Sequence, residues 1–446
     1  MEQTAITIVK DLREAGYEAY FAGGCVRDIL MKHEPNDYDI VTSAKPEEIE
    51  EVLKHDHIIP VGKQFGVILV IKNNHHFEIA TFRSDSGYSD GRRPDYVTYA
   101  SAEKDAFRRD FSVNGMFYDP VTEEIIDYVK GKNDLNEKII RFIGNPETRI
   151  KEDNLRILRA IRFRNRFDFQ FEPETYKSLQ EFGALAKNVS QERIRDELNK
   201  IMKLKHVAKA FNDLEDLQIL KHILPEVLAM KGVAQPTEYH QEGDVWEHTF
   251  KALSSVSTKA PLEVRWAVLL HDVGKPETFK VEADRIHFDG HAKISAEIAK
   301  TILKRLQFST KFIANVYWLI EHHMMMLPFK NMTSRRKWFW YSKPQFNNLL
   351  RLCRADIKGS KPRDFSLYRF IRNDYLAMKK EMKKRKALEI KPLLQGRDLI
   401  KKFKMLPGPE MGKILAQVEH EHLEETIHTK KEAYELVEKM LNKEFK

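Results

Sequence analysis

The first part of the chain, roughly 140 residues, alternates between short apolar runs and amphipathic segments, as expected for strands interleaved with helices. A helical run over 25–31 follows the first strand, and the polar stretch 72–75 predicts a turn between the last two. The predicted strands cover residues 19–22, 37–41, 67–71 and 77–82. We therefore expect a head that contains a sheet.

From about Glu152 onward, nearly every segment has helical periodicity. Pro225 and the polar stretch 235–243 indicate a boundary, and a further helical block then runs to about Asp356. Prolines interrupt the tail at positions 362, 392, 407 and 409. The pattern predicts an α+β protein in which the helices follow the head.

The chain has 446 residues, 42% hydrophobic and 32% charged, which is the composition of a soluble globular protein. No apolar run approaches the roughly 18 residues of a membrane span, and the N-terminal residues carry charges where a signal peptide is apolar. Two cysteines, Cys25 and Cys353, cannot build a disulfide framework or a Cys-rich zinc site. We expect a cytoplasmic protein without membrane contact.

The net charge of +8 is unevenly distributed. Residues 330–405 hold 23 Lys and Arg against 6 Asp and Glu, a surplus of 17, so the rest of the chain carries −9. A solvated Lys-rich helix would explain a run such as 383–386 alone. Because the aromatic run 338–341 lies beside the basic residues, the pattern favours a nucleic acid as partner.

Two short motifs in the head carry the chemistry. Asp37 and Asp39 lie two apart in a predicted strand, so both carboxylates leave one face and can hold divalent cations such as Mg²⁺. Upstream, Gly23 and Gly24 let the backbone approach a phosphate closely, and Arg27 adds a positive charge. A tight turn or a helix cap would explain either motif alone, whereas together they favour nucleotidyl transfer.

These motifs resemble the signature of the polymerase-β-type nucleotidyltransferases. More narrowly, the chain resembles the class II tRNA nucleotidyltransferases, which include CCA-adding enzymes and bacterial poly(A) polymerases. The matching segments are GGCVRD at 23–28, DYD at 37–39, EIATFR at 78–83, YSDGRRP at 88–94, RRDFSVNG at 108–115, EDNLR at 152–156 and SQERI at 190–194. The resemblance implies a polymerase-β-type head with a mixed sheet, an all-α neck, and addition of CCA to tRNA from CTP and ATP.

The resemblance also implies roles for individual residues. Asp37 and Asp39 would be the catalytic ligands of Mg²⁺. The nucleotide would be bound by Gly23, Gly24, Arg27, Arg109, Asp110, Asn114, Asp153, Arg156, Arg159 and Arg162. The family's flexible loop would include Asp90, Arg92 and Arg93.

The spacing of these residues fits those roles but leaves alternatives open. Asp110 and Asn114 are four apart on a predicted helix and could share the ribose hydroxyls. Asp153 and Arg156 are three apart on a helix and could read a base edge, or form an ordinary salt bridge. Arg159 and Arg162 suit phosphate contacts or neck salt bridges equally, and Glu78 suits a metal site or a strand edge.

The middle block contains a second candidate metal site. His271 and Asp272 follow the apolar run 267–270, and imidazole with carboxylate suits Mn, Ni, Fe or Zn. The order of these groups resembles the HD superfamily of metal-dependent phosphohydrolases, which implies phosphatase and 2′,3′-cyclic phosphodiesterase activity. The implied ligands are His248, His271, Asp272, His291, His323 and Asp356, with His322 as the rival of His323.

The tail motifs at 396–399 and 406–412 resemble the C-terminal element of HD-bearing tRNA nucleotidyltransferases, and Gly408-Pro409 predicts a helix start. The basic stretch would bind the acceptor and T arms of tRNA. The implied domains are a head at 1–140, a neck with base-reading and RNA-binding helices at 141–235, an HD domain at 236–360 and a basic helical tail at 361–446.

Four other functions share parts of this pattern. An A-adding enzyme would have every motif, and a bacterial poly(A) polymerase would have the head but normally not the HD block. A CC-adding enzyme would be expected to lack the loop at 88–94, which is present. A phosphohydrolase whose head merely holds RNA is disfavoured by the intact Asp37 and Asp39. The sequence leaves the oligomeric state open.

Overall fold

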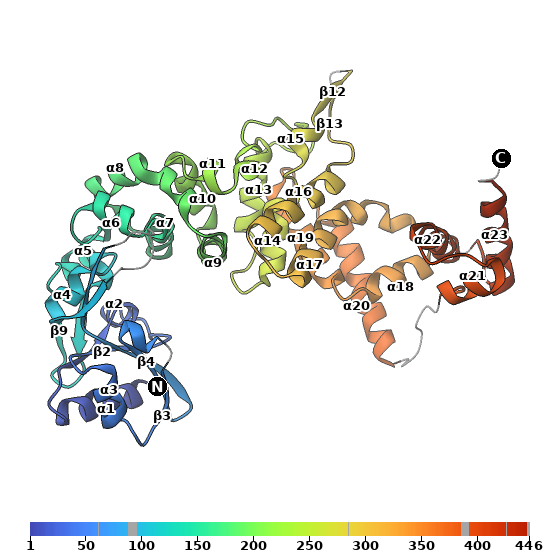
Figure 1. The fold of residues 1–446 in the computed structure, drawn as a ribbon. Helices are drawn as coiled ribbons and strands as arrows, with labels where there is room; N and C mark the ends of the chain where they lie inside the picture. Colours follow the sequence, from blue (N-terminus) through green and yellow to red (C-terminus); the bar gives the residue numbers. More distant parts are fainter. Residues whose placement is uncertain (61, 88–95, 284, 385–391, 425, 444–446) are drawn as a thin grey trace. The chain divides into compact units, whose positions relative to one another are not determined.

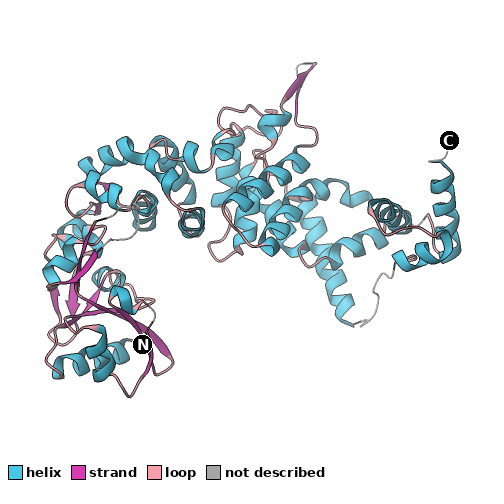
Figure 2. Ribbon diagram, in the orientation of Figure 1, coloured by secondary structure: helices cyan, strands magenta, loops and turns pink. Residues whose placement is uncertain are grey.

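The computed structural model describes two compact units. The first comprises Met1–Leu228 and Arg305–Gln307, and the second Ala229–Lys304 and Phe308–Lys446. The described residues are 1–60, 62–87, 96–283, 285–384, 392–424 and 426–443. Strands are concentrated in the first unit, and helices dominate the second (Figures 1 and 2). No helix among the described residues combines the length and apolar character needed to cross a bilayer.

The first unit is built on a seven-stranded mixed sheet in the order β3-β4-β5-β2-β1-β8-β9. β2 and β5 run parallel, whereas the other neighbouring strands are antiparallel. Its strands are β1 Ala19–Ala22, β2 Asp39–Thr42, β3 His57–Ile59, β4 Val67–Lys72, β5 His75–Thr81, β8 Phe117–Asp119 and β9 Glu124–Ile126. The predicted mixed sheet is thus present.

Local sequence explains how the sheet forms. Along β5, Phe77 and Ile79 are fully buried while Glu78 between them is exposed, because alternate side chains leave opposite faces. Asn73 and Asn74 adopt φ of 53° and 60°, which places the predicted turn between Lys72 and His75 in the left-handed conformation that tight hairpins need. These features fix the register of the β4–β5 hairpin.

Helices flank the sheet and continue beyond it. In α1 the residues Ala5, Ile8, Val9 and Leu12 follow a helical stripe and are fully buried. The helices of this unit are α1 Glu2–Glu14, α2 Gly24–Leu30, α3 Pro46–Val52, η1 Lys63–Phe65, α4 Ala102–Phe107, η2 Ser112–Asn114, α5 Gly131–Glu137, α6 Pro146–Glu152, α7 Leu155–Phe167, α8 Pro173–Phe182, η3 Gly183–Asn188, α9 Gln191–Met202, α10 Val207–Asp216, α11 Leu220–Ile223 and α12 Pro225–Leu228.

Several predicted elements need correction. The second strand begins at Asp39, so Asp37 lies before it rather than within it. Asp153 ends α6 in an extended conformation, so it does not share a helix with Arg156.

The predicted all-α neck and helical body also contain short strand pairs, β10 Ile139–Ile140 with β11 Gln170–Phe171 and β12 Lys280–Glu282 with β13 Arg285–His287. Strands of two or three residues are too short to show a period of two. A further pair in the head joins β6 Arg83–Ser86 to β7 Tyr96–Tyr99.

The second unit surrounds an apolar central helix. Every residue of α14 from Val264 to Leu270 is buried, which requires neighbours on all sides. α13, α17 and α19 pack on α14. The helices of this unit are α13 Val245–Ser254, α14 Leu262–Leu270, α15 Lys275–Thr278, α16 His291–Arg305, α17 Thr310–Glu321, η4 His323–Asn331, α18 Ser334–Ser342, α19 Phe346–Gly359, α20 Ser366–Lys384, α21 Gly396–Phe403, α22 Pro409–Leu423 and α23 Lys430–Lys443.

The C-terminal helices α21, α22 and α23 share a small core of their own, which includes Leu399, Met411 and Val437. α22 begins at Pro409 with Gly408 as its N-cap, as the sequence predicts. The aromatic run in α18 is largely structural, because Trp340 and Tyr341 are 8% and 4% exposed. These two rings are therefore unable to stack on a nucleic acid, contrary to the expectation from sequence.

Gly359 tests the packing of α13 against α19. A Cβ at this position would lie 2.8 Å from the carbonyl oxygen of His248 and 2.9 Å from the Cβ of Ala252. We expect Gly359→Ala to lower the melting temperature by roughly 5 °C, because overpacking costs about 1–3 kcal/mol. A Cβ at Gly412 in α22 would meet open space, so Gly412→Ala should leave the melting temperature unchanged or slightly higher. Equal effects in calorimetry would contradict this account.

Candidate functional site

A cavity of about 610 Å³ in the first unit is lined by residues that sequence singles out in the predicted head and neck. It is bounded by the start of α2, the segment before β2, η2 and one face of α7. Twelve predicted residues line it: Gly23, Gly24, Arg27, Asp37, Asp39, Arg109, Asp110, Asn114, Asp153, Arg156, Arg159 and Arg162. The predicted loop residues Asp90, Arg92 and Arg93 lie outside the described part of the chain.

Carboxylates gather at one end of this cavity. Asp37 is exposed just before β2, and Asp39 is the half-buried first residue of that strand. Ile40 pairs with Ile79 of β5 and both are fully buried, so Asp39 and Glu78, one position earlier, lie together on the other face. Burial, reinforced by Asp37 and Glu78, raises the pKa of Asp39 to about 6. A carboxylate that is costly to ionise alone fits a site for a divalent cation.

Gly23 is required by the geometry at this end. Its φ is +71°, a conformation that favours glycine. A Cβ here would lie 3.3 Å from Nη1 of Arg109 and 3.7 Å from Oδ2 of Asp39. The absence of a side chain thus keeps space open between a guanidinium and a candidate metal ligand.

Asp110 and Asn114 lie together as predicted, although η2 replaces the expected α-helix. Nδ2 of Asn114 donates to Oδ1 of Asp110 over 3.3 Å, and Nε of Arg159 donates to Oδ2 of Asp110 over 2.7 Å. Burial would raise the pKa of Asp110, but Arg159 and these hydrogen bonds outweigh it and lower the pKa to about 2. Asp110 therefore remains an ionised acceptor at neutral pH.

Asp153 and Arg156 both reach the cavity, each held by a different partner. Arg193 of α9 binds the Asp153 carboxylate through two nitrogens, over 3.0 and 2.8 Å. Arg156 donates to Oε2 of Glu152 over 2.6 Å and to the Arg149 carbonyl oxygen over 2.7 Å. The two side chains are thus anchored separately rather than paired with each other.

The arginines of α7 form a stripe along the cavity. Arg159 pairs with Asp110, and Arg162 donates to Glu197 of α9 over 2.5 Å, so both make salt bridges while lining the site. In total, eight arginines and five aspartates line the cavity. The lining residues absent from the predicted set are Asp28, Asn36, Arg83, Arg108, Phe163 and Arg166. Of these, Arg166 could have been found from its helical spacing with Arg159 and Arg162.

In the second unit, six predicted side chains converge from five elements or their ends. His248 Nε2 lies 3.0 Å from Oδ1 of Asp356, and His271 Nε2 lies 3.2 Å from Oδ2 of Asp272. His291 Nε2 lies 3.5 Å from Oδ1 of Asp272. His323 Nε2 lies 3.2 Å from Nε2 of His291. Imidazole and carboxylate groups in this arrangement are donors that could hold a transition-metal ion.

The imidazoles are oriented by hydrogen bonds to their other nitrogen. Nδ1 of His271, His291 and His323 lies 2.8, 2.8 and 2.7 Å from the carbonyl oxygens of Val268, Phe288 and Ile320. This contact turns each Nε2 toward the cluster. Nε2 of His248 and of His271 is buried without a well-aligned hydrogen-bond partner among the described residues, which is the expected state of a metal-ligand atom.

The two central carboxylates control the charge of this cluster. Burial opposes ionisation of His271, but Asp272 and Asp356 outweigh it and raise the pKa of His271 to about 10. Burial and the charge on His271 lower the pKa of His323 to about 4. The cluster thus combines ionised carboxylates with a neutral His323.

Sequence reasoning missed two supporting residues. Oε1 of Glu242 lies 2.9 Å from Nδ1 of His248, and Nζ of Lys275 lies 2.8 Å from Oδ2 of Asp272. Lys275 closes the run His-Asp-Val-Gly-Lys at 271–275, four positions after His271, so its position was a usable signal. His322 instead stacks on Trp318 and directs Nδ1 to the carbonyl oxygen of that residue, outside the cluster.

Three family models match successive parts of the chain. Residues 19–141 match the poly A polymerase head domain, and residues 168–231 match a segment described as "Probable RNA and SrmB-binding site of polymerase A". Residues 288–437 match the tRNA nucleotidyltransferase domain 2 model.

Similar curated proteins are CCA-adding enzymes. The Lactobacillus johnsonii enzyme is 41% identical over 220 residues, which cover 49% of this chain and 54% of the relative. The Lactobacillus helveticus enzyme is 37% identical over 260 residues, covering 58% and 64%. The matched part of the chain therefore spans between about half and just under two thirds of these relatives.

Solved structures of CCA-adding enzymes are similar over nearly the whole chain. The Bacillus stearothermophilus enzyme in complex with CTP has a TM-score of 0.70 at 23% identity, covering 99% of this chain and 98% of that one. The Thermotoga maritima enzyme complexed with tRNA has a TM-score of 0.55 at 21% identity, covering 98% and 95%. The chain therefore matches the poly A polymerase head domain over residues 19–141 and has the fold of the CCA-adding enzymes.

Proposed function

We propose that this chain is a class II tRNA nucleotidyltransferase that adds C, C and A to tRNA 3′ ends from CTP and ATP. The observation that carries the proposal is the cavity lined by the twelve residues predicted to bind Mg²⁺ or the nucleotide, which come from both the predicted head and the predicted neck. The similarity to CCA-adding enzymes supports the same reaction.

Each part of the cavity suits one part of the reaction. Asp37 and Asp39 would hold Mg²⁺, which, when bound, activates the attacking 3′-hydroxyl and neutralises the α-phosphate. The open space at Gly23 admits a phosphate close to the backbone, and Arg27 and Arg109 supply positive charge for the triphosphate. A surplus of arginine over aspartate favours an anionic substrate.

The side chains that we assign to nucleotide selection are each held in place by a neighbouring side chain. Asp110 and Asn114 would orient the ribose hydroxyls, since Asp110 is ionised and fixed by Arg159. Asp153 and Arg156 would offer an acceptor and a donor to the base edge. Because Arg193 and Glu152 anchor them, both can act as a protein template without a nucleic-acid template.

We further propose that the second unit holds a transition metal, among Mn, Ni, Fe and Zn, and hydrolyses phosphate esters as an HD phosphohydrolase. Support comes from the converging histidines and aspartates and from the buried Nε2 atoms of His248 and His271. When bound, the metal would activate water for attack on phosphorus. Glu242 would fix the His248 ring, and Lys275 would balance the charge of Asp272.

The head reaction can be tested with Mg²⁺ and transcripts that lack CCA or end in CC. We expect the first transcript to gain CCA and stop, and Asp37→Asn to slow addition on the order of a thousandfold, because metal stabilisation is worth several kcal/mol. Products are sized on a gel, with Glu14→Gln at the exposed end of α1 as the control. A single A added to the CC transcript alone would indicate an A-adding enzyme, and a long A ladder a poly(A) polymerase.

The raised pKa of Asp39 predicts a cost in stability. In the metal-free protein, ionisation of Asp39 lowers the free energy of unfolding. This loss of stability begins as the pH rises above the usual aspartate pKa, and it is complete once the pH exceeds the raised pKa of about 6. Asp39→Asn removes it, so the variant in EDTA at pH 8 should be more stable by on the order of 1 kcal/mol, after allowance for partial solvent access. We expect differential scanning fluorimetry to show a smaller gain in melting temperature for Asp39→Asn at pH 5 than at pH 8. The control variant Glu14→Gln should show no gain. An unchanged or lower melting temperature at pH 8 would refute this cost.

The second metal site predicts separable activities. Asp272→Asn should reduce the bound transition metal from about one ion per chain to near none, and remove hydrolysis of 2′,3′-cyclic AMP, because Asp272 lies within 4.0 Å of four of the histidines. Metal is measured by mass spectrometry, and Asp289→Asn, an exposed carboxylate nearby in sequence, is the control. Nucleotide addition should persist in both variants. Retained metal in Asp272→Asn would contradict the assignment.

A further inference from the structure

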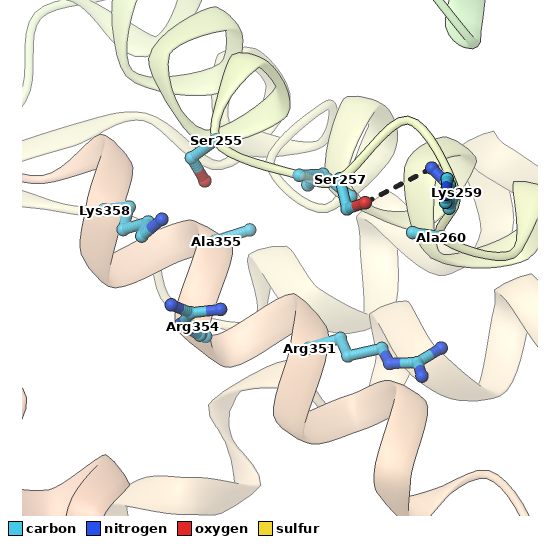
Figure 3. A pocket seen from close by; sticks show the side chains of 9 residues that line it. Ser255, Ser257, Lys259, Ala260, Arg351, Arg354, Ala355 and Lys358 are labelled. Atoms are coloured by element: carbon cyan, nitrogen blue, oxygen red, sulfur yellow. Dashed lines mark hydrogen bonds between the residues drawn. The ribbon is translucent and has the colours of Figure 1, made fainter.

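A hollow in the second unit lies between α19 and the loop that follows α13. Its volume is about 290 Å³. Figure 3 shows Arg351, Arg354 and Lys358 on the helix facing Ser257 and Lys259 on the loop. The lining residues are Ser255, Val256, Ser257, Lys259, Ala260, Arg351, Arg354, Ala355 and Lys358.

The charge of this hollow is entirely positive. Arg351, Arg354 and Lys358 are spaced three and four apart, so they share one face of α19, and Lys259 faces them from the loop. None of the lining residues is acidic, and none of these four cations makes an ion pair within the described part of the chain. Like charges at this spacing repel one another, so the arrangement favours a bound anion.

A buried cation fixes the loop from behind. Arg265 of α14 is 1% exposed, and its Nη1 donates to the carbonyl oxygens of Val256 and Ser257 over 2.9 Å each. Both carbonyl groups are therefore turned toward Arg265, which removes two acceptors from the wall of the hollow. The hollow is thus walled by an anchored loop rather than by a solvated one.

The polar groups of the hollow match phosphate oxygens. Guanidinium groups bind phosphate through paired N–H donors, and the hydroxyl of Ser257 accepts from the Lys259 backbone, which leaves its own proton to donate. No aromatic side chain is among the lining residues, so the hollow offers no platform for a nucleobase. The recognised chemistry is therefore the phosphate group itself.

We propose that this hollow between α19 and the loop after α13 is a phosphate-binding site, occupied by the backbone of an RNA or by a free polyphosphate. It is separate from the metal cluster, which uses Asp356 on another face of the same helix. With RNA as occupant, the proposal rests on the tRNA substrate proposed above; with a free polyphosphate it is independent of the head reaction, because every lining residue belongs to the second unit.

The test compares two double variants of the full chain. Arg354→Gln with Lys358→Gln removes two charges from the hollow, and Lys304→Gln with Lys311→Gln removes two exposed charges from α16 and α17. A labelled RNA hairpin is titrated at several KCl concentrations by fluorescence anisotropy. We expect the hollow variant alone to bind about tenfold more weakly, with a salt slope smaller by roughly 1.8, since each phosphate contact contributes about 0.9.

A second arm uses inorganic tripolyphosphate and follows hydrogen exchange of the amides at 255–260, which excludes signals from the head. Protection of this loop in the wild type, lost in the hollow variant, supports a free polyphosphate as occupant. Loss of hairpin affinity without such protection supports the RNA backbone. The proposal is overturned if neither arm distinguishes the hollow variant from wild type, or if the control variant loses as much hairpin affinity.

Discussion

The ion pair between Asp110 and Arg159 joins the head to α7, the helix that carries four of the eight arginines lining the cavity. Asp110 lies beside η2, and Arg159 lies in the middle of α7. Stacking of Phe111 on Phe142, and the edge contact of Phe111 with Phe163, secure the same junction with apolar surface. Without this junction, the carboxylates near β2 and the guanidinium groups of α7 would not face one cavity.

Much of the fold follows from local sequence, and the exceptions have physical causes. The Asn73–Asn74 turn, the buried helix before His271 and the start of α22 at Pro409 are specified by neighbouring residues, so sequence predicts them well. The break at Asp153 was not predicted, because a salt bridge to Arg193, forty positions away, supports its extended backbone.

The candidate sites also combine residues that local sequence predicts with residues that it does not. Sequence motifs supplied most of the lining of the head cavity, because those side chains lie in short, chemically distinctive runs. The candidate metal ligands are spread over residues 248–356, and they were found from the order of histidines and aspartates around the adjacent pair His271 and Asp272. Partners such as Arg193 and Glu242 escaped notice, since a lone arginine or glutamate resembles any surface residue until the fold brings it to its target. The basic hollow escaped for the same reason, because its walls are about ninety positions apart in the chain.

Helix α19 borders three of the features described above. Asp356 faces the histidines, Gly359 lies against α13, and the arginines line the hollow. A residue exchange that suits one of these surfaces shifts the helix against the other two, because the packed interior does not yield. An exchange on this helix therefore has to suit the candidate metal site, the contact with α13 and the basic hollow together, whereas an exposed position such as Asn347 faces none of these three.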